Sequence, residues 1–164
     1  MQSSATPTCI PTHDERARLW CRYGDAPVLG AVQRRIAASR ALHERVTLLG
    51  RCRPEEMELH YRAADLFVQP SHHEGCSYST IEALACGVAP VVSGIPSMRR
   101  LVGDAGALAL VEDAPARAKA IVEQARRDPA ERRAAARARF ETALSFDHIG
   151  RELRRVYDVM RARA

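Results

Sequence analysis

The sequence predicts an α/β fold in which short buried strands alternate with helices in a parallel sheet. Short apolar runs that end at proline, glycine or a polar residue recur between Leu19 and Val111. Helical patterns separate these runs, and strands that alternate with helices imply parallel pairing. A chain of 164 residues fits one domain with a real hydrophobic core.

The first predicted elements are a strand, a helix and a second strand. Leu19 to Tyr23 is a short, largely apolar run, and Val28 to Leu42 has the spacing of an amphipathic helix. Val46 to Leu49 is apolar and β-branched, which favours a buried strand. Residues 1–17 have neither pattern, so we expect an irregular or disordered end followed by one domain over residues 18–164.

A proline-initiated helix and a third strand come next. Pro54 to Ala63 begins with proline at a first-turn position and carries Glu55 and Glu56 beside it. Both features suit a helix N-terminus. Leu66 to Gln69 is short, apolar and closed by Pro70, which predicts a buried strand.

The central part of the chain predicts a helix between two further strands. Tyr78 to Cys86 is helical in pattern, and Gly87 is placed to end that helix. Ala89 to Ser93 predicts the next strand, and a short helix from Ser97 to Val102 leads to a last strand, Ala107 to Val111. Three C-terminal helices follow: Ala116 to Arg127, Pro129 to Leu144 and Ile149 to Ala162.

The most informative residues are Glu74 and Glu82. Glu74 lies in the loop after the strand Leu66 to Gln69, and Glu82 lies about one turn into the following helix. In open α/β sheets ligands bind at the carboxyl ends of the strands, and the free N–H groups of a helix start suit a phosphate. Two acids beside such a cradle favour a ligand with both hydroxyls and phosphates, such as a nucleotide sugar, over two unrelated surface glutamates.

Several landmarks occur in the order found in one enzyme family. Glu44 to Gly50 resembles the family's "rV-x-x-x-G" strand, Tyr61 to Asp65 its "y-x-x-A-D" helix end, and Glu74 to Glu82 its paired-glutamate motif. Gly94 to Ser97 and Gly103 to Gly106 resemble two later loops. Nearly all of the chain is therefore similar to the C-terminal, donor-binding domain of retaining GT-B glycosyltransferases of the family 4 type (glycosyl transferases group 1).

This resemblance implies a fold and a reaction. The fold would be a Rossmann-like parallel sheet, a single GT-B C-terminal half, with C-terminal helices. The reaction would be transfer of a hexose from a nucleoside-diphosphate sugar with retention at the anomeric carbon. No cofactor, essential metal or covalent nucleophile is expected. Catalysis would come from positioning and from stabilising charge on the leaving diphosphate.

The resemblance also implies roles for single residues. Glu74, the expected catalytic residue, would meet the hydroxyls of the transferred sugar, and Glu82 would accept hydrogen bonds from the ribose. The loop that contains Arg51 would pass the nucleobase. The remaining expected donor-binding residues lie near the sugar and the diphosphate: Gly75, Cys76, Ser77, Ser79 and Thr80.

Two departures from the family pattern qualify this assignment. The family's donor domain opens with a Gly-Arg…Lys-Gly loop that neutralises the diphosphate, but Lys119 is the single lysine of this chain. A second, acceptor-binding domain is also expected in a whole GT-B enzyme. We therefore expect a donor half that is inactive without an acceptor domain or partner chain, and whose acceptor is a glycan or lipid-linked glycan.

Two alternative functions remain open at this stage. One is a catalytically silent module that binds nucleotide sugars or supports a partner chain. The other is a different enzyme on a similar fold, such as a sugar-nucleotide epimerase, which would need no acceptor. The paired glutamates and the loop Gly94 to Ser97 favour the transferase.

Charge is concentrated at the C-terminal end. Residues 115–164 hold 13 Lys or Arg against 7 Asp or Glu. A basic segment invites a nucleic-acid or membrane function, but no aromatic interleaving or recognition motif accompanies it. We interpret these arginines as solvated helix faces and expect no nucleic-acid partner, with contact to an acidic membrane surface left open.

The cysteines and histidines predict no metal site. The five cysteines have no CxxC pair, and their odd number without a secretory signal favours reduced thiols. His72 and His73 are adjacent, so their side chains point apart in an extended segment. We expect a cytoplasmic protein, with peripheral association at the inner face of the membrane as a further option.

Overall fold

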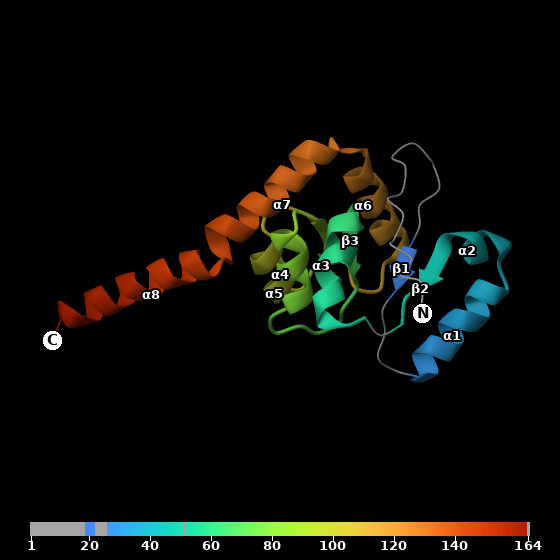
Figure 1. Cartoon of the computed structure of the whole chain (residues 1–164), viewed down its shortest axis with the longest axis horizontal. Coiled ribbons are helices and arrows are strands. Elements are labelled where there is room, and N and C mark those ends of the chain that lie inside the picture. The colour runs from blue at the N-terminus through green and yellow to red at the C-terminus, as the bar shows by residue number, and fades with distance from the viewer. Residues whose placement is uncertain (1–18, 22–25, 51, 164) are drawn as a thin grey trace, which may run out of the picture. The chain divides into compact units, whose positions relative to one another are not determined.

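A computed structural model of the chain describes residues 19–21, 26–50 and 52–163, and side chains only from Leu29 onward (Figure 1). The predicted irregular end, residues 1–17, and the predicted site residue Arg51 lie outside the described residues. The chain forms two compact units, residues 1–57 and 58–164, and each is considered by itself below.

Among its described residues, the first unit contains a two-stranded parallel sheet, two whole helices and the start of a third. Strand β1 (Leu19–Cys21) pairs with β2 (Val46–Leu48). Between them lie α1 (Ala26–Ala37) and α2 (Arg40–Arg45), so the prediction of one helix from Val28 to Leu42 was wrong. The break comes at Ser39, which has extended backbone angles and accepts a hydrogen bond from Leu42 N at its side-chain oxygen. A serine at such a position starts a new helix because its hydroxyl replaces the missing backbone acceptor.

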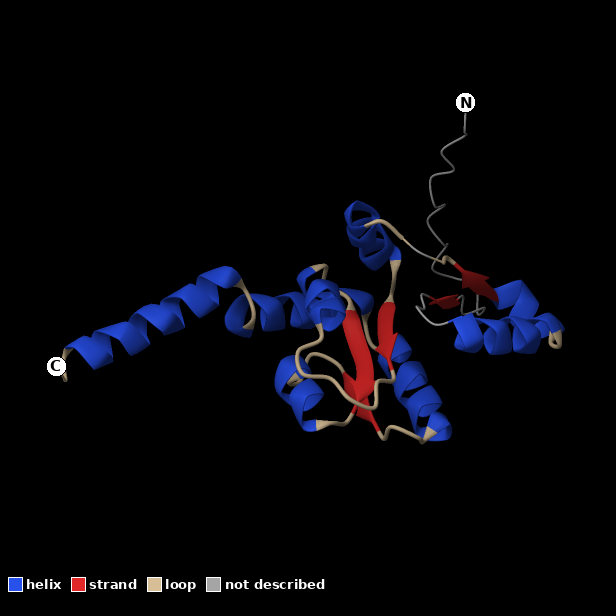
Figure 2. Cartoon of the chain, turned by 90° about the horizontal axis from the view of Figure 1, so that it is seen from below, coloured by secondary structure: helices blue, strands red, loops and turns tan. Residues whose placement is uncertain are grey.

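The second unit contains a three-stranded parallel sheet in the order β3-β4-β5. Figure 2 shows helices on both sides of this sheet. Its strands are β3 (Leu66–Gln69), β4 (Ala89–Ser93) and β5 (Ala107–Ala109). Its helices are the end of α3 (Pro54–Ala63), α4 (Tyr78–Ala85), α5 (Pro96–Val102), α6 (Ala114–Arg126), α7 (Pro129–Ala143) and α8 (Phe146–Arg161). The predicted α/β class with a parallel sheet is confirmed.

The core of this unit is built around β4. All residues of β4 are buried, as expected for a central parallel strand that is covered on both faces. Val92 packs with Met98 and Val102 of α5, whereas Leu84 of α4 packs with Ala136 of α7. Burying a valine, leucine or methionine side chain contributes about 1.5–3 kcal/mol. These contacts hold α5 against β4 and α4 against α7.

Gly87 ends α4 as predicted. Its φ is 72°, the left-handed region that glycine adopts without steric cost. Gly87 N donates to Leu84 O over 3.0 Å, and Val88 N donates to Ala83 O over 2.8 Å. This is the Schellman pattern, which satisfies the last carbonyls of the helix and turns the chain into β4.

Four arginines of α7 donate hydrogen bonds to backbone carbonyls at the C-terminal ends of other helices. Arg133 binds Ala64 O after α3, and Arg137 binds Ala85 O of α4. Arg139 binds carbonyls of α5, and Arg132 binds Gln124 O of α6. The interpretation of the basic segment as solvated helix faces was therefore wrong for Arg132, which is only 3% exposed, whereas Arg137 of the same helix is exposed as expected. Burial also lowers the pKa of Arg132 from its ordinary value.

Candidate functional site

The predicted site lies at the carboxyl ends of β3 and β4, where two loops meet. The loop after β3 contains Glu74, and the loop after β4 leads to Ser97 at the start of α5. Ser97 Oγ donates a 2.6 Å hydrogen bond to the Glu74 carbonyl oxygen. The two loops are therefore tied together at the edge of the sheet where α/β proteins bind ligands.

The N-terminus of α4 opens onto the loop that contains Glu74. Ser77 is the N-cap, and its Oγ accepts from Thr80 N at 3.3 Å. The intrahelical ladder begins with Ile81 N, which donates to Ser77 O. The N–H groups of Tyr78 and Ser79 precede it and have no acceptor within their own helix. Such groups, together with the helix dipole, attract an anion.

Glu74 is half-buried and held on one side of its carboxylate. Its Oε1 accepts from Gln69 Nε2 at 2.7 Å and from Ser71 Oγ at 3.2 Å. Within the described residues, both of these bonds fall on Oε1. The carboxylate is therefore oriented by the protein and keeps an oxygen, Oε2, for a further donor.

Glu82 is exposed on α4 and also has a fixed partner. The hydroxyl of Tyr61 donates to its Oε2 over 3.0 Å. Tyr61 is 6% exposed and comes from α3, so the two helices α3 and α4 are joined through this bond. Nothing in the sequence pattern pairs residues 61 and 82.

The other predicted residues divide into accessible and buried groups. Gly75 and Cys76 are exposed and Ser79 is half-buried, whereas Ser77 and Thr80 are buried. The Thr80 hydroxyl binds Gln69 Oε1 at 2.9 Å. A contact between Thr80 and a ligand would therefore have to be indirect.

Three residues of this site were missed by the sequence prediction: Gln69, Ser71 and Tyr61. Gln69 had one available signal, since it is the polar residue that ends an otherwise apolar strand at the ligand-binding edge. Ser71 was visible only as a loop residue, and Tyr61 only as the first residue of the helix-end motif. Their contacts depend on the tertiary fold.

Histidine and cysteine side chains are further candidates for chemistry near α4. Within the described part of the chain, no three His, Cys, Asp or Glu side chains gather as metal ligands. His72 and His73 are both exposed. Cys86 is half-buried, and burial raises the pKa of its thiol, which makes it a poor nucleophile at neutral pH.

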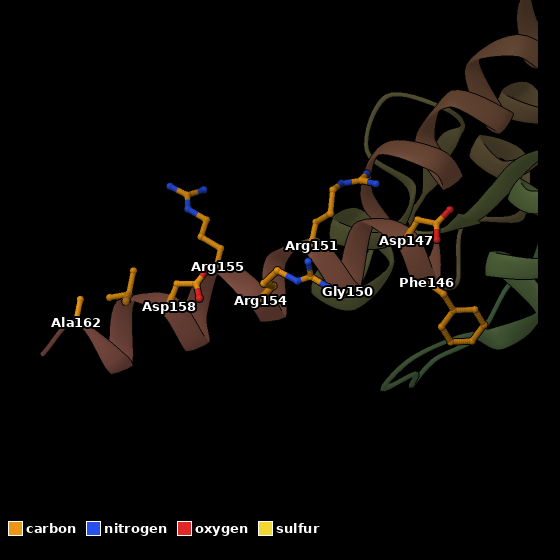
Figure 3. Close-up of a pocket in the computed structure, with 9 residues that line it drawn as sticks. Phe146, Asp147, Gly150, Arg151, Arg154, Arg155, Asp158 and Ala162 are labelled. Atoms are coloured by element: carbon orange, nitrogen blue, oxygen red, sulfur yellow. The ribbon is translucent and has the colours of Figure 1, made fainter. Parts of the chain in front are cut away.

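Helix α8 offers a different surface. Figure 3 shows a shallow pocket along this helix, lined by side chains such as Phe146, Arg151 and Arg155. All of the lining residues come from residues 146–162, so no second helix or strand contributes to the pocket. Val156, Tyr157 and Met160 are more than half exposed. A small-molecule site needs polar groups that converge, so we do not place the site here. Among the described helices none has the length and apolar character needed to cross a bilayer.

Curated relatives resemble part of this chain. O-antigen chain mannosyltransferase B of Escherichia coli is 39% identical over 71 residues, 43% of this chain and 19% of that protein. The GDP-mannose:cellobiosyl-diphosphopolyprenol alpha-mannosyltransferase of Xanthomonas oryzae pv. oryzae is 33% identical over 73 residues, 44% of this chain and 19% of that protein. The chain thus spans about a fifth of the length of these relatives.

Solved structures extend the likeness to most of the fold. Sucrose-phosphate synthase from Thermosynechococcus elongatus matches with a TM-score of 0.68 and 29% identity, over 90% of this chain and 39% of that one. The catalytic domain of Starch Synthase IV from Arabidopsis thaliana, bound to ADP and acarbose, matches with a TM-score of 0.62 at 14% identity, over 92% of this chain and 40% of that one. The second likeness supports the fold alone. These neighbours are GT-B glycosyltransferases, so the predicted fold type is confirmed.

The family assignment comes from a match over most of the chain. The model of the family described as "Glycosyl transferases group 1" matches residues 8–126. This range includes the loop with Glu74, the start of α4 and the loop with Ser97. The chain therefore belongs to the glycosyl transferases group 1 family.

Proposed function

We propose that this chain is the donor-binding half of a retaining glycosyltransferase that transfers a hexose from a nucleoside-diphosphate sugar. The observation that carries the proposal is the placement of two oriented carboxylates, Glu74 and Glu82, before and within α4. Between them lies a helix N-terminus with N–H groups for a phosphate. Family membership supports glycosyl transfer in general.

Each part of the donor would meet a chemically matched group. Glu74 would accept hydrogen bonds from hydroxyls of the transferred sugar through Oε2. The diphosphate would rest against the N–H groups of Tyr78 and Ser79, where the dipole of α4 stabilises negative charge. Glu82 would accept from the ribose hydroxyls. Because Tyr61 already binds Oε2 of Glu82, the ribose would use the remaining acceptor positions of this carboxylate.

The chemistry would depend on positioning and charge. As the bond between the anomeric carbon and the phosphate oxygen breaks, negative charge grows on the diphosphate. The start of α4 would stabilise that charge without reorganising, which is the most effective form of electrostatic catalysis. Neither a covalent protein nucleophile nor an essential metal is part of the proposal.

The acceptor would be a glycan or a lipid-linked glycan. The Xanthomonas relative supports this proposal, since its name gives a cellobiosyl-diphosphopolyprenol as the acceptor. Transfer in GT-B enzymes takes place between two domains, and the proposal gives this chain the donor half. We therefore expect no turnover by this chain alone.

A thermal-shift series in EDTA tests donor binding. The ligands are UDP-glucose, GDP-mannose and ADP-glucose, each beside its bare diphosphate. A ligand at about 100 times its Kd should add about 2.7 kcal/mol, which raises Tm by about 5–10 °C in a domain of this size. A shift with one nucleotide family supports the proposal and names the base, and no shift with any ligand contradicts it.

Two variants test the division of roles. Glu82→Ala should weaken the bare diphosphate and the nucleotide sugar about equally. Glu74→Ala should leave the Kd of the bare nucleoside diphosphate unchanged. It should remove the additional affinity that the nucleotide sugar has over the bare diphosphate. Glu123→Ala, an exposed glutamate of α6, is the matched control. Equal losses for both ligands in the Glu74 and Glu82 variants would rule out this division.

A further inference from the structure

The side-chain amide of Gln69 links both halves of the proposed site. Its Oε1 accepts hydrogen bonds from Ser77 Oγ at 2.7 Å and Thr80 Oγ1 at 2.9 Å. Its Nε2 donates to Glu74 Oε1 at 2.7 Å and to Ser71 Oγ at 3.1 Å. A primary amide has two N–H donors and two acceptor positions, and all four are used here.

Chemistry fixes the orientation of this amide. An ionised carboxylate can only accept hydrogen bonds, so the amide nitrogen must face Glu74. The amide oxygen then faces the hydroxyls of Ser77 and Thr80, which can donate. Since Gln69 is the last residue of β3 and its strand pairs with the buried β4, its backbone is held by the sheet.

The two ends of the amide contact two different functional groups. On one side, Ser77 caps the N-terminus of α4, where a diphosphate would bind. On the other side, Glu74 would bind the transferred sugar. We infer that Gln69 is a positioning residue that sets the Glu74 carboxylate at a fixed place relative to the start of α4 and so determines discrimination between a nucleotide sugar and its bare diphosphate.

This inference rests on the proposed function and adds a specificity-determining residue to it. Glu74 Oε1 is taken by Gln69 and Ser71, so its side chain cannot turn to a different partner without losing both bonds. A sugar hydroxyl then meets a carboxylate that is already oriented. Binding costs less when groups are oriented in advance, and only the sugar-bearing ligand would benefit.

The decisive variant is Gln69→Glu. It keeps an oxygen for Ser77 and Thr80 but replaces the donor that faces Glu74 by a second carboxylate, which repels it at pH 8. We expect the ratio of the Kd of the bare diphosphate to the Kd of the corresponding nucleotide sugar to fall about tenfold. This is the change that results from loss of one hydrogen bond to a charged group. The new carboxylate also lies beside Ser77 at the start of α4, so the Kd of the bare diphosphate should rise as well, but by less than the Kd of the nucleotide sugar.

The exchange variant Gln69→Glu with Glu74→Gln separates positioning from stability. It restores an amide–carboxylate hydrogen bond, but with the acid at position 69. The Tm of the double variant should be higher than that of Gln69→Glu. Its ratio of the two Kd values, bare diphosphate to nucleotide sugar, should equal that of Glu74→Gln alone. Gln33→Glu, at an exposed position of α1, controls for the added charge.

The experiment is isothermal titration with UDP-glucose and UDP, GDP-mannose and GDP, or ADP-glucose and ADP, whichever pair the unaltered chain binds most tightly. An unchanged Kd ratio in Gln69→Glu, or equal losses for both ligands, overturns the positioning role while the proposed function stands. Failure of the unaltered chain to bind any pair overturns the proposed function, and the inference with it.

Discussion

The hydroxyl of Tyr61 on α3 donates a 3.0 Å hydrogen bond to Glu82 Oε2 on α4. The tyrosine is buried, and its ring meets that of Phe67 edge to face at 5.9 Å between centroids. Glu82 is exposed apart from this contact. A rigid aromatic side chain thus orients a carboxylate that would otherwise rotate freely in solvent, and this carboxylate is the proposed ribose acceptor.

Tyr61→Phe should weaken binding of the bare nucleoside diphosphate by about threefold to tenfold. The phenyl ring keeps its packing against Phe67, but Glu82 loses the donor that orients it. Loss of one hydrogen bond to a charged group corresponds to about 1.5–3 kcal/mol when buried, and the exposed carboxylate recovers part of this from water. Isothermal titration with UDP, GDP or ADP measures the effect.

Tyr157→Phe on α8 is the control for this substitution, because its side chain is 66% exposed and lies outside the proposed site. It should leave the Kd unchanged. If Tyr61→Phe also leaves the Kd unchanged while Glu82→Ala abolishes binding, then Glu82 needs no orienting partner and the proposed role of Tyr61 is wrong.

Arg132 should be the most costly of the α7 arginines to replace. Its Nη1 donates to Gln124 O at 3.0 Å, and its Nη2 lies 3.6 Å from Asp65 Oδ1. Arg132→Met keeps the aliphatic stem but removes the charged donor to the Gln124 carbonyl, which, among the described residues, then accepts only from Arg127 N. Loss of a hydrogen bond from a charged group costs about 1.5–3 kcal/mol. Asp65 is exposed and is re-solvated at little cost.

Thermal denaturation measures this loss as a decrease in Tm of about 2–4 °C for each kcal/mol. The matched control is Arg154→Met on α8, where no residue is buried. Equal Tm values for the two variants would contradict the role that we assign to the α7 arginines.

The sequence predicted the local elements of the second unit well, because their signals are local. Pro54–Ala63, Leu66–Gln69 and Ala89–Ser93 have the bounds expected from proline starts, apolar runs and polar ends. The error in α1 and α2 came from Ser39, where a single hydroxyl decides between a continuous helix and two short ones. Hydrophobic periodicity does not distinguish these two cases, because the apolar spacing continues across Ser39.

The site was predicted less completely than the fold. Glu74 and Glu82 were found because their spacing places them at a strand end and on a helix. The residues that orient them were not found, since Tyr61–Glu82 is a contact across 21 positions and depends on how α3 and α4 pack. The burial of Arg132 was missed for the same reason, because an arginine in a basic run has the same sequence pattern whether it contacts water or helix carbonyls.

Gly106→Ala should destabilise the chain more than Gly87→Ala. A Cβ at Gly106 would lie 2.2 Å from the Pro90 carbonyl oxygen, so backbone of β4 or β5 must shift. Such overpacking typically lowers the free energy of unfolding by about 1–3 kcal/mol, and a clash with backbone lies at the upper end of this range. At Gly87 the cost of about 1–2 kcal/mol comes from the left-handed backbone.

Urea denaturation ranks these variants, with Gly150→Ala as the control. A Cβ at Gly150 meets nothing within 4 Å, and alanine favours a helix by up to about 1 kcal/mol. We expect no loss there. A Gly106→Ala variant as stable as the unaltered chain would contradict the close approach of β5 to Pro90.

The thiols of Cys76 and Cys86 should react at different rates, and a bound donor should change only one of them. Cys76 is exposed in the loop after Glu74, whereas burial raises the pKa of half-buried Cys86. Iodoacetamide reacts with the thiolate, so at pH 8 Cys76 should be alkylated first, and the alkylation rate at Cys86 should keep rising to higher pH.

A raised pKa in the folded state also means that Cys86 favours folding below its unfolded pKa and loses that contribution at more alkaline pH. Peptide mass spectrometry follows both sites, and a bound nucleotide sugar should slow alkylation of Cys76 while leaving Cys86 unchanged. Protection of neither thiol at saturating ligand would place the donor away from the loop after Glu74.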